Sequence, residues 1–74
     1  MKAFILLVTK GDNSEIMKSL NSFPCVLEAH RLYGDYDIIV KVKVQDIHEL
    51  SKLKNKLLNE SSALYAEVLI IEEG

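Results

Sequence analysis

Residues 32–44 read LYGDYDIIVKVKV, and this stretch decides the fold. From residue 38 onward, apolar and mixed positions alternate with the period of a β-strand. Gly34 can adopt a positive φ at no steric cost, so Gly34-Asp35-Tyr36 is expected to form a tight turn. The short connection predicts that residues 26–33 and 37–44 are the two strands of an antiparallel hairpin. The wholly apolar face of the second strand consists of Ile38, Val40, Val42 and Val44.

A strand and a helix are expected on each side of this hairpin. Residues 3–9 are a continuous apolar run that favours a strand. Asp12 or Asn13 can cap the helix that follows, and Glu15 has the spacing of a capping box with Asp12. Pro24 ends that segment. The buried stripe of this helix is expected to consist of Ile16, Met17, Leu20 and Phe23.

The second half of the chain repeats this order of elements. Asp46 is expected to cap a helix, with Glu49 three residues later, and residues 64–71 form the last strand. Right-handed connections around a central hairpin predict a ferredoxin-like α+β fold, with a four-stranded antiparallel sheet and both helices on one face. The buried stripe of the second helix is expected to include Ile47, Leu50, Leu53, Leu57 and Leu58.

The length of 74 residues predicts a single domain spanning residues 1–74. So short a chain has a marginal core, and association with another subunit is a usual remedy. Both faces of the first and the last strand are apolar: in the first, Phe4, Leu6 and Val8 oppose Ile5 and Leu7. Two helices cover one sheet face only, so the other face predicts a homodimer that packs sheet to sheet, or an unidentified partner chain.

Composition excludes several classes of function. The net charge is −2 with no basic stripe, which argues against direct nucleic-acid binding. No apolar run approaches the ~20 residues of a membrane span, and the single cysteine fits the cytoplasm. His30, His48 and Cys25 lack the paired spacing of a zinc site, so neither a metal nor another cofactor is expected.

The densest polar cluster is Gly34-Asp35-Tyr36-Asp37. The aspartates can bond nearby backbone amides and simply shape the hairpin. The same carboxylates and backbone groups could instead hold the ammonium and carboxylate of an amino acid. The residues themselves leave both interpretations open.

Taken together, the hairpin of residues 26–42, its Gly-Asp-Tyr-Asp turn and the Asp46 cap before a leucine-rich helix resemble one family. It is the C-terminal effector (RAM) domain of the Lrp/AsnC feast/famine transcription regulators. The resemblance runs from about Lys2 to Glu72. It implies a dimeric α+β barrel that pairs through its sheets, octamers built from four dimers, and effector amino acids bound between dimers. On that basis Gly34, Asp35, Tyr36 and Asp37 line the site.

Two departures from the family pattern stand out. No helix-turn-helix precedes the domain, so the chain resembles a stand-alone RAM protein that would co-assemble with full-length regulators. The family's Gly-Val pair and threonine-rich strand start are replaced by residues 59–66, NESSALYA. The candidates for the neighbouring subunit's share of the pocket are Ser61, Ser62 and Tyr65.

Two alternatives share this fold. A small dimeric α+β-barrel enzyme would place a histidine or an acid among the helix-facing residues, and those of residues 38–44 are apolar. An ACT-like amino-acid-binding regulatory domain differs only through the turn at residues 34–37. The chain is therefore predicted to be a ligand-sensing or assembly module rather than an enzyme.

Overall fold

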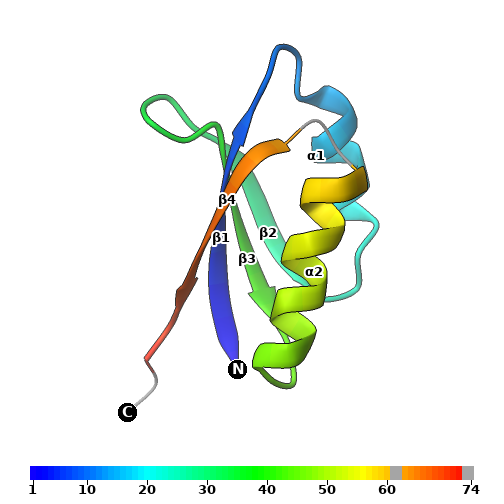
Figure 1. Cartoon of the computed structure of the whole chain (residues 1–74), viewed down its shortest axis with the longest axis vertical. Helices are drawn as coiled ribbons and strands as arrows, with labels where there is room; N and C mark the ends of the chain where they lie inside the picture. The colour runs from blue at the N-terminus through cyan, green and yellow to red at the C-terminus, as the bar shows by residue number, and fades with distance from the viewer. Residues whose placement is uncertain (61–62, 73–74) are drawn as a thin grey trace.

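The elements of the chain follow the predicted order. A computed structural model describes residues 1–60 and 63–72. Within them the strands form one four-stranded antiparallel sheet in the order β2-β3-β1-β4, and both helices pack on one side of it (Figure 1). This arrangement confirms the ferredoxin-like α+β fold. The elements are β1 (Lys2–Thr9), α1 (Ser14–Asn21), β2 (Val26–Arg31), β3 (Ile38–Lys43), α2 (Ile47–Glu60) and β4 (Ala63–Ile70).

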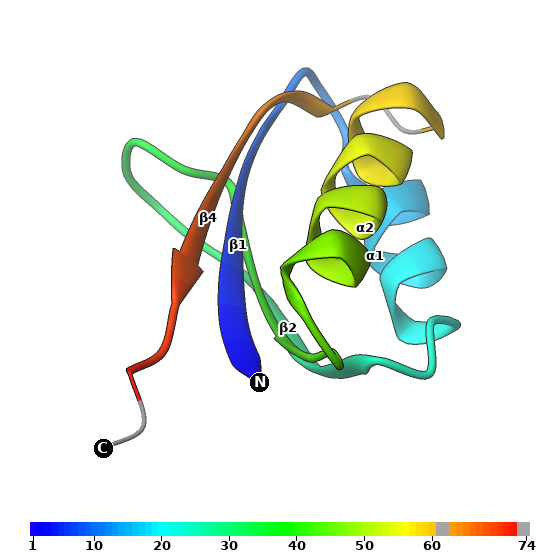
Figure 2. The ribbon, with the colours of Figure 1, turned by 60° about the horizontal axis from the view of Figure 1, so that its bottom comes forward.

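The core lies between the sheet and the helices, as Figure 2 shows from a second direction. On β1 and β3 every second side chain points into it, which is the consequence of the strand period. The alternation predicted for residues 38–44 is confirmed. The fully buried large side chains are Ile5, Leu7, Leu20, Ile38, Val40 and Val42.

The start of α2 carries the predicted capping box in a slightly shifted form. The Glu49 N–H donates to Oδ1 of Asp46 at 2.9 Å, and Oε2 of Glu49 accepts from the Gln45 N–H at 2.8 Å. The prediction that Ile47 is buried is wrong, because 61% of it is exposed. Ile47 is the first residue of α2, and this end of the helix lies beyond the end of β3 (Figure 1).

The start of α1 differs from the predicted capping box. Oδ1 of Asp12 accepts from the Ser14 N–H at 3.0 Å and from the Ser14 hydroxyl at 2.7 Å. These two bonds lower the pKa of the Asp12 carboxyl. The helix begins at Ser14, so Glu15 is too early in the first turn to complete a box with Asp12. Arg31 Nε instead donates to Oδ1 of Asn13 at 2.9 Å and ties β2 to this end of the helix.

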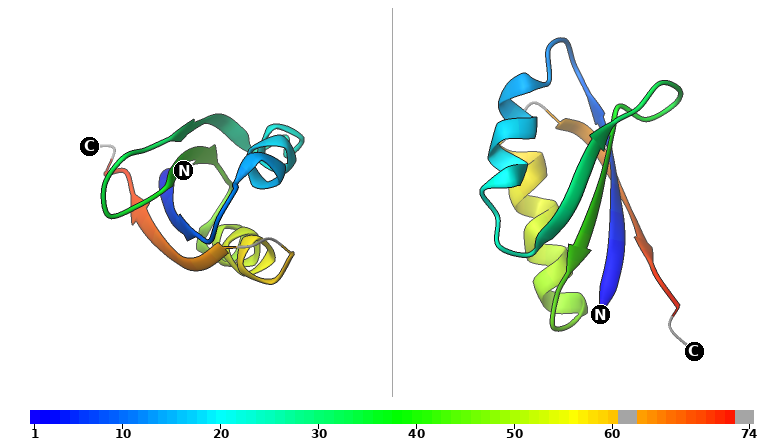
Figure 3. Two further views of the ribbon diagram at one scale, coloured as in Figure 1. Left: turned by 90° about the horizontal axis from the view of Figure 1, so that it is seen from above. Right: turned by 180° about the vertical axis from the view of Figure 1, so that it is seen from behind.

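One sheet face and the β2–β3 turn are free of helices. The turn, residues 32–37, projects from the side opposite to α1 and α2, as both views of Figure 3 show. Of the residues that the structure describes, none belongs to a helix long and apolar enough to cross a membrane. In the described part of the chain, the turn and the uncovered sheet face are thus the two surfaces of the sheet that no helix covers.

Candidate functional site

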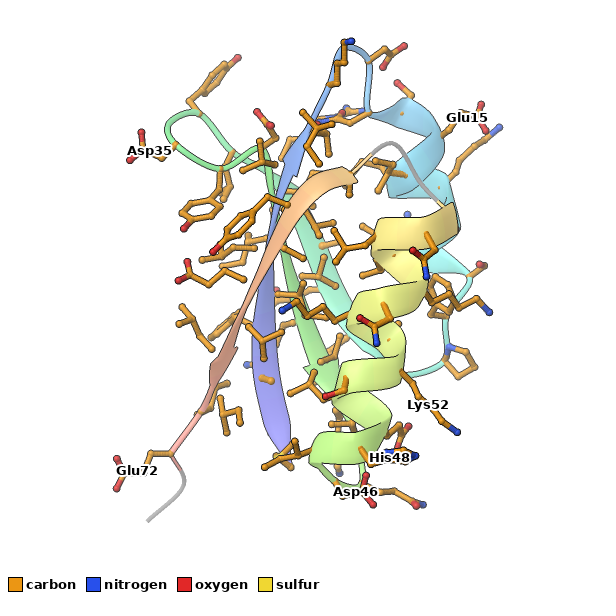
Figure 4. The ribbon with its side chains drawn as sticks, in the orientation of Figure 1. Glu15, Asp35, Asp46, His48, Lys52 and Glu72 are labelled. Carbon is orange, nitrogen blue, oxygen red and sulfur yellow. The ribbon has the colours of Figure 1, made fainter. Side chains whose placement is uncertain are left out.

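The turn begins earlier than predicted, because β2 ends at Arg31. The Leu32 N–H donates to the Asp37 carbonyl at 2.8 Å and closes the base of the loop. Gly34 has φ = +134°, a conformation that residues with a side chain rarely adopt, so the prediction of a positive φ there is confirmed. Tyr33, Gly34 and Asp35 are exposed at the tip, and Figure 4 shows Asp35 pointing away from the sheet.

Asp37 anchors the turn to β1. Its backbone N–H donates to the Leu7 carbonyl at 2.8 Å. Its carboxylate Oδ2 accepts from the Thr9 N–H at 2.7 Å. The pairing of β1 with β3 ends at Leu7 and Ile38, and the carboxylate satisfies a β1 amide beyond that end. Asp37 thus has the structural role that aspartates often have in turns.

Tyr36 folds back from the turn onto the sheet. Its hydroxyl donates a hydrogen bond to Oε2 of Glu67 in β4. That bond, with lesser effects of desolvation and of the nearby acidic groups of Glu67, Tyr65 and Asp35, raises the pKa of Tyr36 to about 12. The phenol therefore stays a hydrogen-bond donor at neutral pH.

The predicted site residues fall into two groups. Gly34 and Asp35 are at the exposed tip, whereas Tyr36 and Asp37 are tied to the sheet and half-buried. Tyr65 is 53% exposed on β4, opposite Val8, and close enough to Tyr36 to affect its ionisation. The predicted Ser61 and Ser62 lie outside the described residues. Asp35 and Tyr65 thus each lie near Tyr36.

Glu67 was missed as a site residue by the sequence reasoning. Strand alternation places it with Tyr65 and Leu69, on the face away from the helices. The sequence signal that could have identified Glu67 is its position as a single carboxylate in the middle of an otherwise apolar strand. Its partner Tyr36 is 31 residues away in sequence, so the contact itself could not be read from spacing.

The uncovered sheet face is apolar in its centre. We define the open face as the side chains of β1, β3 and β4 that point away from the helices, together with Glu28 and His30 of β2. In register, Leu6 lies between Ile39 and Glu67, and Phe4 lies between Lys41 and Leu69. Lys41 Nζ is 6.0 Å from the centroid of the Phe4 ring. The apolar members of the open face are Phe4, Leu6, Val8, Ile39, Tyr65 and Leu69.

The remaining polar candidates have ordinary surroundings. His30 Nε2 and Glu28 Oε2 are 3.1 Å apart at the β2 edge of the open face. Cys25 is half-buried, and this burial raises the pKa of its thiol. His48 is exposed beside Asp46 at the start of α2 (Figure 4). Residues 1–60 and 63–72 contain no group of three or more histidine, cysteine or acidic side chains that could hold a metal ion.

Comparison with known proteins identifies a family of similar sequences. The family model for the Lrp/AsnC ligand binding domain matches residues 2–71. A curated relative, the HTH-type transcriptional regulator FL11 of Pyrococcus horikoshii, is 38% identical over 52 residues, which are 69% of this chain and 34% of that protein. The chain thus matches only about a third of the length of that relative.

Solved structures of similar proteins have the same fold. The crystal structure of FFRP-DM1 superposes with a TM-score of 0.85 at 32% identity, covering 96% of this chain and 97% of that one. E. coli AsnC superposes with a TM-score of 0.86 at 29% identity, covering 99% of this chain and 51% of that one. These similarities confirm the resemblance that the hairpin and its turn predicted.

Proposed function

The chain belongs to the Lrp/AsnC ligand-binding domain family, and we propose that it is a non-enzymatic regulatory module. In this proposal the module pairs through its open face and binds a small amino acid at the turn. The observation that carries the proposal is the uncovered apolar centre of the open face. An exposed apolar patch bordered by charged residues is typical of an interaction surface.

A second copy of the open face is the partner we propose. Phe4, Leu6 and Ile39 are half-buried by their neighbours on the sheet alone, and Leu69 is 48% exposed. Packing two such faces together would bury roughly 800 Å² per partner, an ordinary interface. It would also supply the apolar burial that a domain of this size lacks.

The ligand part of the proposal rests on the turn. Asp35 presents a carboxylate at the tip, and among the described residues its side chain has no hydrogen-bond or ion-pair partner. Such a carboxylate is suited to the ammonium group of an amino acid. Backbone groups of Tyr33 and Gly34 are exposed beside it and suit the ligand's carboxylate. A neighbouring dimer would contribute Tyr65, Ser61 and Ser62.

Larger assemblies follow from the same reasoning. Because the ligand lies between dimers in the proposed arrangement, binding would stabilise octamers or other rings. The curated relatives are named as transcriptional regulators. We propose that co-assembly with such regulators is the route by which this domain affects transcription.

Pairing is tested by sedimentation velocity at micromolar concentration with a pair of lysine variants. Leu6→Lys puts a charge in the centre of the open face and should yield a folded monomer. Ser51→Lys adds the same charge at an exposed position of α2 and should leave the dimer intact. A wild-type protein that sediments as a monomer would overturn the pairing.

Ligand binding is tested by titration calorimetry against the twenty amino acids. Binding of one or a few of them, lost in Asp35→Ala, is the expected result. If no amino acid gives heat or a thermal shift, the chain is left with an assembly role alone.

A further inference from the structure

One hydrogen bond joins the turn to the open face. Tyr36 belongs to the turn, and Glu67, which accepts from its hydroxyl, belongs to the edge strand β4. In register Glu67 is level with Leu6 in the middle of β1, and both of its neighbours on that face are apolar. The side chain of Tyr36 therefore reaches across β1 to a carboxylate within the pairing surface.

Glu67 depends on Tyr36 within its own chain. In the part of the chain that the structure describes, the one salt bridge joins His30 to Glu28, so no cation neutralises Glu67 there. The Glu67 carboxylate accepts a hydrogen bond from the Tyr36 hydroxyl. Both side chains are already half-buried in a single copy.

Pairing of the open faces would place this carboxylate under a second sheet. A carboxylate that is removed from water is strongly destabilising unless hydrogen-bond donors remain on it. Tyr36 supplies such a donor only while the turn keeps its hydroxyl on Glu67. The turn is also held by the Leu32–Asp37 backbone bond at its base and by the bonds of Asp37 to Leu7 and Thr9 of β1.

We infer that the Tyr36–Glu67 hydrogen bond couples the conformation of the turn to pairing of the open face, with Glu67 as a positioning residue for the turn. The inference rests on the proposed pairing. The turn must hold Tyr36 against Glu67 for two faces to pair, and pairing in return fixes the turn. By reciprocity, a ligand that favours this turn conformation strengthens pairing by the same factor.

The test is a double-mutant cycle on the dimer dissociation constant, measured by sedimentation equilibrium. Tyr36→Phe leaves the Glu67 carboxylate without its donor and should weaken the dimer about tenfold. Glu67→Gln keeps an oxygen that can accept from Tyr36 and carries no charge, so a change below about threefold is expected. Adding Glu67→Gln to Tyr36→Phe should restore most of the lost affinity, because a neutral amide is easier to bury.

Tyr33→Phe is the matched control. It removes a phenol hydroxyl from the same turn, at a fully exposed position outside the open face. It should leave the dissociation constant within about twofold of the wild type. An equal effect of Tyr36→Phe and Tyr33→Phe would mean that loss of any phenol of the turn weakens the dimer, and would overturn the coupling.

Amide hydrogen exchange gives a second readout that needs no ligand. The reporters are the Leu32, Asp37 and Thr9 amides, whose bonds hold the turn. They should exchange several-fold more slowly above the dimer dissociation constant than below it in the wild type, and this difference should vanish in Tyr36→Phe.

The possible failures are distinguishable. Additive effects in the cycle, with exchange independent of Tyr36, overturn the coupling and leave the proposed dimer standing. A wild type that stays monomeric overturns the pairing and the coupling together. Absence of amino-acid binding alone leaves the coupling intact, since neither readout uses a ligand.

Discussion

Replacing Asp37 by alanine tests the role that the structure gives to this half of the turn. The substitution removes the acceptor of the 2.7 Å hydrogen bond from the Thr9 N–H. The two backbone bonds of residue 37, to Leu7 and from Leu32, do not need the carboxylate and should survive. The variant therefore isolates one side-chain bond at the base of the turn.

The expected cost follows from that bond. A hydrogen bond to a charged acceptor contributes about 1.5–3 kcal/mol to the free energy of unfolding. Thr9 is half-exposed, so water can partly replace the carboxylate, and the lower half of this range applies. A loss of about 1.5–2 kcal/mol is a large fraction of the roughly 4–11 kcal/mol that a domain of this length has.

Equilibrium unfolding in urea at one fixed protein concentration measures the loss, because unfolding of a dimer depends on concentration. With a slope near 1 kcal/mol/M, the midpoint should fall by about 1.5–2 M. Asp37→Asn keeps an uncharged acceptor and should lose about half as much. Asp35→Ala, at the exposed tip, should stay within about 0.5 kcal/mol of the wild type. Equal losses for Asp35→Ala and Asp37→Ala would refute the division of the turn into an anchored and a free half.

Three further predictions concern the turn, the phenol and the core. Gly34→Ala meets no atom within 4 Å but must adopt φ = +134°, so backbone strain alone should lower the free energy of unfolding by about 1–3 kcal/mol in thermal or urea unfolding. The pKa of Tyr36 is raised from 10.0 to about 12, so its bond to Glu67 stabilises the fold fully below pH 10 and is lost as the pH rises through about 12. The difference between the absorbance titrations of wild type and Tyr36→Phe at 295 nm should have its midpoint near pH 12. A midpoint near pH 10 would contradict the bond. Leu20→Ala, at a fully buried position of α1, should lower the free energy of unfolding by about 2–5 kcal/mol. Leu27→Ala, at a position 51% exposed, should lower it by less than about 1 kcal/mol. Similar urea midpoints for the two variants would contradict the assigned core.

Local patterns were enough to predict the elements and the core. The alternation after Asp37 sets which side chains of β3 face the helices, and it holds at Ile38, Val40 and Val42. The second helix obeys its spacing at Leu50, Leu53 and Leu57. Ile47 obeys the same spacing and is nevertheless exposed. It is the first residue of the helix, and periodicity alone does not show where the helix begins relative to the end of β3.

The different roles of Asp35 and Asp37 in the turn could not be predicted from such local patterns. Asp35 and Asp37 have the same chemistry and are two residues apart, so composition gives them one role. Their roles differ because the pairing of β1 with β3 ends at Leu7 and Ile38, and the Thr9 amide beyond that end lies within reach of Asp37. That contact joins residues 28 apart in the sequence, so the local pattern around the two aspartates does not show it.

The polar residues of the open face bear on how selective its pairing can be. A wholly apolar face would associate with many exposed apolar surfaces, since the hydrophobic effect has no direction. Here the apolar centre is bordered by the His30–Glu28 pair on β2 and by Glu67 on β4, the two edge strands of the described sheet. A partner that covers Glu67 without keeping Tyr36 on it would bury an unsatisfied charge, and the cost of burying that charge weakens the association. The same hydrogen bond that positions the turn therefore also disfavours the wrong partners of the open face.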